Sequence, residues 1–281
     1  MRCAAKTNLF LKVTGKREDG YHLLKTLFIP LSGVADELTL LDGGAGIRCL
    51  SAEAAFPDNL VCRAAQLYAD RAGITPAWDF VLKKNIPVAA GLGGGSSDAA
   101  ATLRALNKIY MLANDEDLRI LSEMIGSDVP FCLHGGIYLC RGRGERLKPL
   151  DIRLSDTYVV AIGNSRVSTP KAYFNLDIKF NNFIDAYNHN YHEMIESLDN
   201  NGRGDIPLYN IFEQVISIDE INKIKEIMTK NEAEYTMMSG SGPAVFGKFS
   251  DSNCADRACI TLSENGFTAF KCCSVYPEDT L

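Results

Sequence analysis

The first 41 residues contain stretches in which apolar and polar side chains alternate with the period of two that a half-buried strand requires. Residues 6–13 (KTNLFLKV) show this alternation, and residues 25–31 and 36–41 are interpreted as further strands. Asp19-Gly20 lies between the first two stretches and is a turn signal. The chain is therefore expected to begin with β-structure.

Three later stretches change to the spacing of an amphipathic helix, in which apolar residues recur every three or four positions. They are residues 59–72, 98–112 and 115–125. Asp58 and Asn59 stand where they could cap the first of these helices, and a run of glycines precedes the second.

A boundary is expected near the middle of the chain. Strand-like stretches lie at residues 137–140 and 157–162, and the segment GRGERLKPLD between them carries turn formers and charges. We place a domain break near residue 152, which gives domains at 1–152 and 153–281.

The second domain is expected to begin with the strand at 157–162 and to pass through a polar, Asn-rich stretch at 175–205. A helix at 217–230 and strands around 243–249 and 267–274 follow. Helices and strands are mixed without strict alternation, so the pattern predicts an α+β sandwich.

The most informative segment is PVAAGLGGGSSDAAA at residues 87–101, which directly precedes an amphipathic helix. Glycines let backbone N–H groups approach a phosphate, and a helix N-terminus adds unpaired donors and the positive end of the helix dipole. The alternative is a tight turn in which Ser96 or Ser97 is an ordinary N-cap. Four glycines within the five positions 91–95 are more than a cap needs, so the segment favours an anion site.

Other nucleotide-binding and nucleophile motifs do not fit this segment. A Walker A loop requires a lysine after its last glycine, and Ser96 follows here. Ser96 also stands where a dinucleotide-binding fold has its third glycine, and the protein-kinase signatures and the GxSxG elbow are absent. A different class of nucleotide-binding protein is indicated.

Charge and cysteine content narrow the possible partners. The formal net charge of −6 disfavours a nucleic-acid or anionic-membrane surface, which would need an excess of lysine and arginine. Nine cysteines without a CxxC pair or zinc-ligand spacing are typical of reduced thiols. No signal peptide or apolar run of transmembrane length is recognised, so a soluble, cytoplasmic protein is expected.

Three motifs, in the same order along the chain, resemble those of one enzyme superfamily. Pro87-x-x-x-Gly91-Leu92-Gly93-(Gly94-Gly95)-Ser96-Ser97 resembles the central motif of the galactokinase, homoserine, mevalonate and phosphomevalonate (GHMP) kinases. Residues 238–247 (MSGSGPAVFG) resemble the third, glycine-rich motif of that superfamily. Residues 5–11 (AKTNLFL), 19–22 (DGYH) and 127–131 (SDVPF) resemble the member whose acceptor is a cytidine-diphosphate-linked sugar alcohol.

The resemblance implies both a fold and a reaction. The fold is a two-domain α+β GHMP kinase fold, with an N-terminal ATP-binding domain like domain 2 of ribosomal protein S5 and a ferredoxin-like C-terminal substrate-binding domain. The reaction is ATP-dependent phosphorylation of the 2-hydroxyl of 4-diphosphocytidyl-2-C-methylerythritol, a step in the non-mevalonate route to isoprenoids. Two alternatives are a superfamily kinase for another small alcohol, such as homoserine or mevalonate, and a non-catalytic nucleotide sensor.

Phosphoryl transfer needs positioning, charge neutralisation and a group that orients the attacking hydroxyl. The resemblance implies Asp128 as the base and Lys6 as the partner that attracts the γ-phosphate. Asp128 follows the helix at 115–125, and Pro130 is expected to end any helical run there. Without the motif, Asp128 would be read as an Asx-turn and Lys6 as a surface residue on an edge strand.

The resemblance also implies the residues that contact the two substrates. Those expected to bind ATP are Pro87, Val88, Ala89, Ala90, Gly91, Leu92, Gly93, Gly94, Gly95, Ser96 and Ser97, with Asn59 and Lys84 near the adenosine. Asn59 and Lys84 could instead be an N-cap and an exposed cation. Those expected to bind the acceptor are Asn8, Tyr21, His22, Thr169, Tyr173, Gly240, Ser241 and Gly242.

Within this set, His22 is expected to bind cytosine through hydrogen bonds, and Tyr21 and Tyr173 by stacking. A hairpin with two solvent-facing rings is the alternative for Tyr21 and His22. Two departures from the family stand out: Ile211 replaces an acidic residue, and the glutamate that binds Mg²⁺ in some members is not identified. Mg²⁺ is expected to accompany ATP and to be held mainly by phosphates and water, with Ser97 as the suggested protein ligand.

Overall fold

The computed structural model describes residues 1–44, 46–51, 59–180 and 206–274. Asp58, the second candidate for capping the first helix, lies outside the described residues, as does the 181–205 part of the Asn-rich stretch. None of the helices in the described ranges has the length and apolar character needed to span a membrane.

Two long antiparallel strands, β1 (Arg2–Lys16) and β2 (His22–Asp42), form the centre of the first sheet. The turn expected at Asp19-Gly20 joins them. The strands expected separately at 25–31 and 36–41 are one strand here, because irregularities in the register let β2 bend without breaking. The sheet order is β3-β4-β2-β1-β8, with β5 paired to β2 and β6 paired to β5. These strands are β3 (Gly46–Leu50), β4 (Ala77–Lys83), β5 (Tyr138–Gly142), β6 (Arg146–Pro149) and β8 (Tyr209–Asn210).

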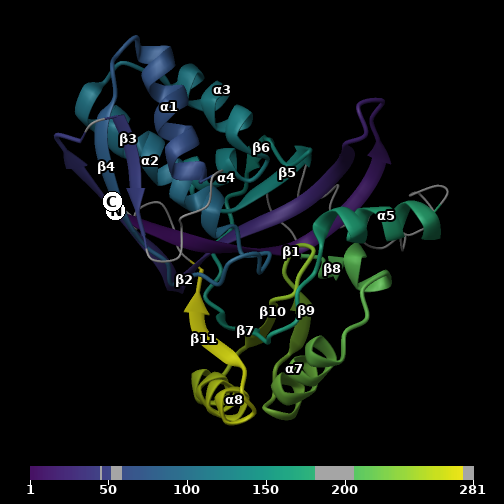
Figure 1. Cartoon of the computed structure of the whole chain (residues 1–281). Coiled ribbons are helices and arrows are strands. Elements are labelled where there is room, and N and C mark those ends of the chain that lie inside the picture. The colour runs from purple at the N-terminus through teal and green to yellow at the C-terminus, as the bar shows by residue number, and fades with distance from the viewer. Residues whose placement is uncertain (45, 52–58, 181–205, 275–281) are drawn as a thin grey trace.

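Helices cover one face of this sheet (Figure 1). Their buried faces pack on Trp78 and Phe80 of β4. Asn59 caps α1 by accepting a hydrogen bond from the Val61 N–H at 2.8 Å. The helices are α1 (Leu60–Ala72), α2 (Gly94–Tyr110), α3 (Asp115–Ile125) and α4 (Val129–His134).

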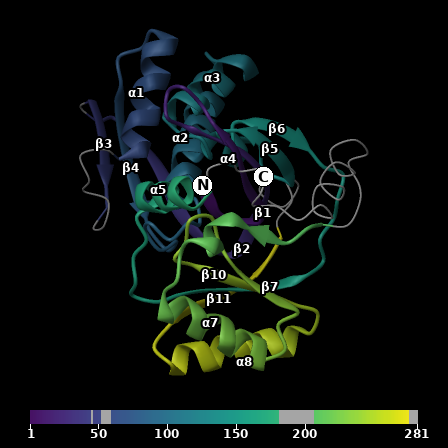
Figure 2. The same cartoon turned by 90° about the vertical axis from the view of Figure 1, so that its right-hand side faces the viewer.

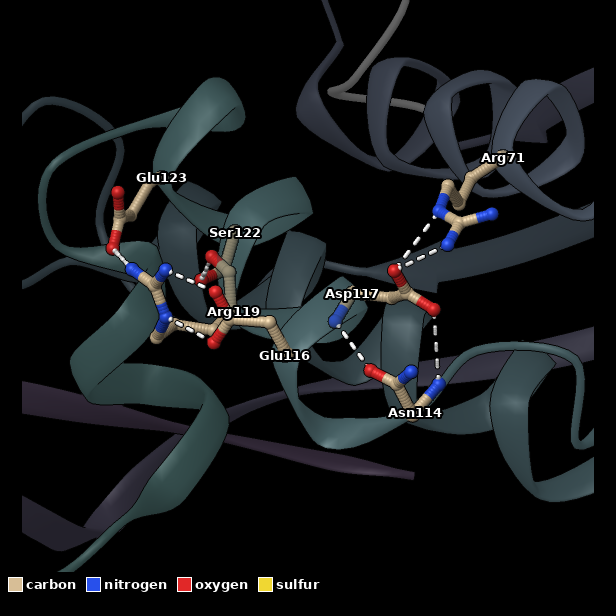
Figure 3. Close-up of polar contacts among 7 residues, drawn as sticks. All are labelled: Arg71, Asn114, Glu116, Asp117, Arg119, Ser122 and Glu123. Atoms are coloured by element: carbon tan, nitrogen blue, oxygen red, sulfur yellow. Dashed lines mark hydrogen bonds and ion pairs between the residues drawn. The ribbon is translucent and has the colours of Figure 1, made fainter.

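Helix α3 has the bounds expected from the sequence, and local contacts explain why. Asn114 and Asp117 form a capping box, in which each side chain accepts a hydrogen bond from the other residue's backbone N–H. The same Asp117 carboxylate accepts two hydrogen bonds from Arg71, which ties α3 to the end of α1 (Figure 3). On the exposed face of α3, Arg119 pairs with Glu116 and Glu123.

The expectation that Pro130 ends a helical run is wrong. Proline lacks an N–H group and is tolerated in the first turn of a helix, where that group has no intrahelical partner. Pro130 occupies such a position, because it lies in the first turn of the short helix α4, which begins at Val129. Asp128 is the N-cap residue of α4, but its side chain makes no capping hydrogen bond.

The second sheet has the antiparallel order β11-β7-β10-β9. Helices α7 and α8 cover its outer face (Figure 2). The chain order of strand, helix, two strands, helix and strand, with this sheet order, is the ferredoxin-like arrangement expected for the second domain. The elements are β7 (Thr157–Ile162), α7 (Asp219–Lys230), β9 (Tyr235–Met238), β10 (Val245–Phe249), α8 (Ser252–Glu264) and β11 (Thr268–Cys273).

Two further elements lie between β7 and α7. The sequence analysis missed α5 (Thr169–Lys179) because Ala172 and Leu176 are its only fully buried positions, which leaves a weak apolar pattern. A short 3₁₀ helix, η1 (Ile211–Gln214), follows β8.

The two sheets share one hydrophobic core. Phe10 and Ile29 of the first sheet belong to the same buried cluster as Tyr158 and Phe246 of the second. We keep the domain boundary near residue 152 as a proposal, because it falls in the connection between β6 and β7. The chain also crosses back over it, since β8 pairs with β1 in the first sheet.

Candidate active site

The glycine-rich segment before α2 lines a cavity of about 390 Å³. Helix α2 begins at Gly94, and Gly93 is its N-cap residue with a φ of 70°. The alternative in which Ser96 or Ser97 caps the helix is therefore wrong, because both serines lie inside its first turn. The lining residues are Asn59, Leu60, Leu82, Lys84, Pro87, Val88, Ala89, Ala90, Gly91, Leu92, Gly93, Gly94, Gly95, Ser96 and Asp98. Ser97, which is buried, is not among them.

Two glycines in this loop are required by close approaches of other parts of the site. Gly91 has a φ of 82°, and a Cβ atom there would lie 2.2 Å from the backbone oxygen of Ser239 in the third motif. Gly93 would place a Cβ atom 2.7 Å from Cγ of Lys6. The Lys6 N–H also donates to the Leu92 oxygen at 2.9 Å. The loop thus packs directly against both of the other motifs.

Lys84 is neither exposed nor a simple surface cation. Its ammonium group lies between the carboxylates of Asp36 and Asp98, and all three side chains are buried. The second Asp36 oxygen accepts hydrogen bonds from the backbone N–H groups of Asn85 and Ile86, at 2.6 and 2.8 Å. Asp36 therefore fixes the course of the chain just before the glycine-rich loop.

Burial of these charges changes their protonation. Burial raises the pKa of Asp98 to about 7; the ammonium group of Lys84 opposes the shift, and the charge of Asp36 adds to it. Burial alone would lower the pKa of Lys84, but the neighbouring Asp98 and Asp36 carboxylates outweigh it and raise that pKa. The Asp98 Oδ1 atom is buried and has no hydrogen-bond partner among the described residues.

A second cavity of about 660 Å³ lies beside the first, and Gly91 and Gly93 line both. It brings together most of the residues expected to bind the acceptor, from β1, β2, α5 and the third motif. They are Asn8, Tyr21, His22, Thr169, Tyr173, Gly240 and Ser241, together with Lys6 and Asp128. Gly242, which was also expected, does not line it.

Lys6 and Asp128 form an ion pair in this cavity, with 3.3 Å between Lys6 Nζ and Asp128 Oδ2. Lys6 is buried, and its backbone N–H donates to the glycine-rich loop, so the alternative of a surface lysine on an edge strand is wrong. The Asp128 side chain is directed to Lys6 rather than into an Asx-turn. One carboxylate oxygen lies beside a buried cation, while the carboxylate remains 30% exposed.

Asn8 extends this polar group along β1. Its side-chain oxygen accepts a hydrogen bond from Lys6 Nζ at 3.1 Å, as expected for positions i and i+2 on one face of a strand. Its amide nitrogen donates to the Thr26 hydroxyl at 2.7 Å, and Thr26 donates to the Phe10 oxygen. The orientation of the amide is therefore determined by its neighbours.

At the far end of the cavity, the His22 and Tyr173 rings stack, with 4.5 Å between their centroids. The His22 side chain is only 8% exposed, and its Nε2 atom lies 2.6 Å from Oδ1 of Asp177. Burial raises the pKa of Tyr173 well above its usual value. Tyr21 is exposed, and the Arg143 guanidinium lies 5.3 Å from its ring centroid. Only Tyr21 thus fits the solvent-facing hairpin alternative.

Polar contacts join the third motif to the other two. The Thr7 hydroxyl donates to the Ser239 hydroxyl, which donates to the Gly91 oxygen, each at 3.0 Å. The Asn210 amide donates to the backbone oxygens of Met238 and Gly240, at 2.7 and 2.8 Å. The hydroxyls of Thr169 and Ser241 lie 2.7 Å apart.

Sequence reasoning missed several of these residues: Asp36, Arg143, Asp177 and Asn210. Asp177 lies four positions after Tyr173, so recognition of helix α5 would have placed both on one face. Asn210 directly precedes Ile211, whose apolar side chain is fully buried in a hydrophobic cluster with Phe212 and Met228. Ile211 therefore contributes packing at the position where the family has an acidic group.

Comparisons with known proteins place the chain in a family. Residues 59–136 match the family described as the GHMP kinases N terminal domain, and residues 183–266 match the GHMP kinases C terminal family. A protein of Clostridium novyi (strain NT) named 4-diphosphocytidyl-2-C-methyl-D-erythritol kinase is 39% identical over 265 residues, covering 91% of this chain and 92% of the relative. A protein of Bacillus cereus (strain B4264) with the same name is 39% identical over 254 residues, covering 88% of this chain and 86% of the relative.

Solved structures show the same relationship. A crystal structure of 4-(cytidine 5'-diphospho)-2C-methyl-D-erythritol kinase has a TM-score of 0.80 and 34% identity, covering 98% of this chain and 99% of its own. A structure of L. major mevalonate kinase in complex with R-mevalonate has a TM-score of 0.72 at 18% identity, covering 98% of this chain and 96% of its own. The second similarity is one of fold.

Proposed function

The chain belongs to the GHMP kinases, and from this premise we propose that it transfers the γ-phosphoryl group of ATP to the 2-hydroxyl of 4-diphosphocytidyl-2-C-methyl-D-erythritol. This reaction is a step in the non-mevalonate route to isoprenoids. The observation that carries the proposal is the position of the Lys6–Asp128 pair in a cavity that shares Gly91 and Gly93 with the glycine-rich loop. An acceptor hydroxyl beside Asp128 would therefore lie next to the phosphates held by the loop.

The first catalytic role we propose is that of Asp128. Its carboxylate accepts the proton of the attacking hydroxyl while the bond from that oxygen to the γ-phosphorus forms and the bond from the γ-phosphorus to the bridging oxygen breaks, so that ADP leaves. A general base must reach its proton within hydrogen-bond distance, and Asp128 is partly exposed to the cavity.

Lys6 has the complementary role in the proposed mechanism. Its buried ammonium group stabilises negative charge on the transferring phosphoryl group, an interaction that is stronger away from water. The hydrogen bond to Asn8 and the ion pair to Asp128 hold the ammonium group in place before the substrates bind.

For ATP, we propose that the loop at residues 87–97 holds the phosphates through its backbone N–H groups and the N-terminus of α2. Asn59 and Lys84 lie across the same cavity and are proposed to contact the adenosine. Asn59 is also the N-cap of α1, so these two functions coexist in one residue.

Mg²⁺ is proposed to enter with ATP and to neutralise phosphate charge. The described residues contain no group of three or more His, Cys, Asp or Glu side chains placed to hold a metal ion. The proposal therefore relies on the phosphates, on water and on the hydroxyl of Ser97, which is the kind of hard oxygen ligand that Mg²⁺ accepts. Ser97 lies in the first turn of α2, where its N–H donates to the Gly93 oxygen at 2.9 Å.

For the acceptor, we propose that His22 hydrogen-bonds the cytosine while Tyr21 and Tyr173 contact its faces. Thr169, Gly240, Ser241 and Gly242 are proposed to contact the rest of the molecule, although Gly242 is not one of the residues that line the cavity. The net charge of −6 supports a small-molecule partner over nucleic acid, and the polar substrates support a cytoplasmic location.

The direct test is ATP-dependent phosphorylation by the purified protein, with the product identified by mass. The protein is offered 4-diphosphocytidyl-2-C-methyl-D-erythritol, homoserine, mevalonate and galactose in parallel. Phosphorylation of the cytidine compound alone is expected. Turnover of another acceptor would contradict the roles of Tyr21, His22 and Tyr173, and ATP binding without any turnover would favour a nucleotide sensor.

A further inference from the structure

The backbone of the third motif is held by a buried amide, that of Asn210 at the end of β8. Asn210 is 2% exposed, and its amide nitrogen donates to the backbone oxygens of Met238 and Gly240. Its side-chain oxygen accepts a hydrogen bond from the Phe212 N–H at 3.0 Å. Because an N–H donor occupies the amide oxygen, the NH₂ group must face the two backbone oxygens. Both donors and the acceptor of this side chain are therefore in use.

Gly240 lies next to the proposed reacting groups. A Cβ atom at this position would be 3.7 Å from Lys6 Nζ and 3.7 Å from Asn8 Oδ1. Gly240 also lines the acceptor cavity, as Lys6 and Asp128 do. A displacement of Gly240 would consequently change the space in which the phosphoryl group meets the Lys6 ammonium group.

The neighbours of Gly240 in the third motif have contacts of their own. The Ser239 N–H donates to the Ala244 oxygen at 2.8 Å, and the Met238 N–H donates to Glu213 Oε1 at 2.6 Å. Within the described residues, by contrast, Asn210 is the one hydrogen-bond partner of the Gly240 backbone. Loss of the Asn210 amide would therefore release Gly240 while Ser239 stays attached.

We propose that Asn210 is a positioning residue for phosphoryl transfer, because its amide holds the backbone of Gly240 beside the Lys6 ammonium group. Asn210 itself touches neither substrate in this proposal and acts through Gly240. A misplacement of about 1 Å among groups that position the reactants can lower a rate roughly 100-fold. The inference rests on the proposed function, since it assumes that a phosphoryl group is transferred beside Lys6.

The test is Asn210→Ala, which removes both donors and leaves the two backbone oxygens without this partner. We expect kcat per folded molecule to fall roughly 10- to 100-fold in the phosphorylation assay. The dissociation constant for ATP should change little, because neither Asn210 nor Gly240 lines the cavity beside the glycine-rich loop. Steady-state kinetics and an ATP titration measure the two quantities, and circular dichroism gives the folded fraction.

Asn231→Ala is the matched control. The Asn231 amide also donates to a backbone oxygen, that of Ile227 at 2.9 Å, and Asn231 lines neither cavity. A general loss of stability would affect both variants, whereas only Asn210→Ala should lower kcat. Hydrogen exchange followed by mass spectrometry should also become faster at residues 238–242 in Asn210→Ala and stay unchanged there in Asn231→Ala.

A second variant covers the case in which Asn210→Ala does not fold. The hydroxyl of Asn210→Ser can donate one hydrogen bond in place of two, so this variant should have a kcat between those of the wild type and Asn210→Ala. If the folded Asn210 variants have the same kcat as Asn231→Ala, the positioning role is overturned.

The two levels of inference fail separately. If the wild type phosphorylates the cytidine compound and the Asn210 variants keep its kcat, the role of Asn210 is wrong and the proposed function stands. If the wild type phosphorylates another acceptor, the proposed function is wrong, and the same comparison of kcat with that acceptor decides the role of Asn210. If the wild type has no turnover with any acceptor, both are wrong.

Discussion

At the scale of single residues, the charged side chains of the site already have polar partners before a substrate binds. Lys6 lies between Asn8 and Asp128, and Lys84 lies between Asp36 and Asp98. In both cases the cation is buried and a carboxylate faces a cavity. The two pairs have different functions in our proposal, because one acts on the reacting groups and the other holds the nucleotide.

Replacing Asp128 tests the first pair. Asp128→Asn removes the base but keeps the shape of the side chain, so we expect kcat to fall by roughly 10²- to 10⁴-fold. The dissociation constant for ATP should change little, because Asp128 lines only the acceptor cavity and not the cavity beside the glycine-rich loop. Steady-state kinetics and an ATP titration provide the measurements. Unchanged turnover would remove Asp128 from the mechanism.

The pKa of Asp98 predicts how stability depends on pH. Its pKa is raised from 3.8 to about 7 in the folded protein, so between these values the folded state binds more protons than the unfolded state. This group therefore costs stability progressively as pH rises through that range, and the cost is constant above it. Asp98→Asn removes the titration.

The variant should consequently gain stability relative to the wild type as pH rises from about 5.5 to 7, and no further above about 7.5. Urea unfolding of both proteins across this range measures the difference. A difference that does not change with pH would show that Asp98 has an ordinary pKa.

At the scale of elements, the glycine-rich loop depends on contacts with the third motif. Gly91→Ala adds a Cβ atom that meets the Ser239 oxygen, and the loop must move to relieve the contact. Gly73→Ala is the matched control, since Gly73 also has a positive φ but no atom lies near its added Cβ. Both should lose about 1 kcal/mol of stability to backbone strain.

Only Gly91→Ala should also raise the KM for ATP, by roughly tenfold or more, as a 1 Å displacement of binding groups does. Thermal unfolding and ATP kinetics on both variants separate the two effects. An equal KM in the two variants would show that the loop does not depend on its contact with Ser239.

The elements that could be predicted from the sequence are those determined by local pattern. The capping residues and apolar spacing of α3 are local, and so is the continuous apolar character of β7. Helix α5 was not predicted because only two of its residues are buried, which leaves a weak apolar pattern, and the short strand β8 was not predicted because it forms only by pairing with the distant β1. Among site residues, motifs identified Lys6 and Asp128, whereas Asp36 and Asp177 act through contacts with residues 48 and 155 positions away.

At the scale of the whole molecule, the two sheets are expected to unfold together. Phe246 of the second sheet lies in one core cluster with Phe10 and Ile29 of the first. Trp78 is the single tryptophan of the chain and is buried on β4 of the first sheet, so its fluorescence reports the unfolding of that sheet. Fluorescence and circular dichroism should therefore give one common transition.

Phe246→Ala should lower the unfolding free energy by about 3 to 5 kcal/mol, with the fluorescence and circular dichroism transitions still coincident. Denaturant titration followed by both signals makes the measurement. If the Trp78 fluorescence transition has the same denaturant midpoint in Phe246→Ala as in the wild type, the part of the chain that contains the first sheet is stable on its own.

The backbone of Gly91 and Gly93 borders both substrates at once. A substitution there is expected to change the binding of ATP and the binding of the acceptor alcohol together. Acceptor specificity therefore cannot be changed at this wall without also changing ATP binding. The opposite wall, built by the β1–β2 hairpin and α5, touches only the acceptor cavity. Libraries that vary Tyr21 and Tyr173 should therefore yield kinases with altered acceptors, whereas libraries in the shared loop should yield mainly inactive proteins.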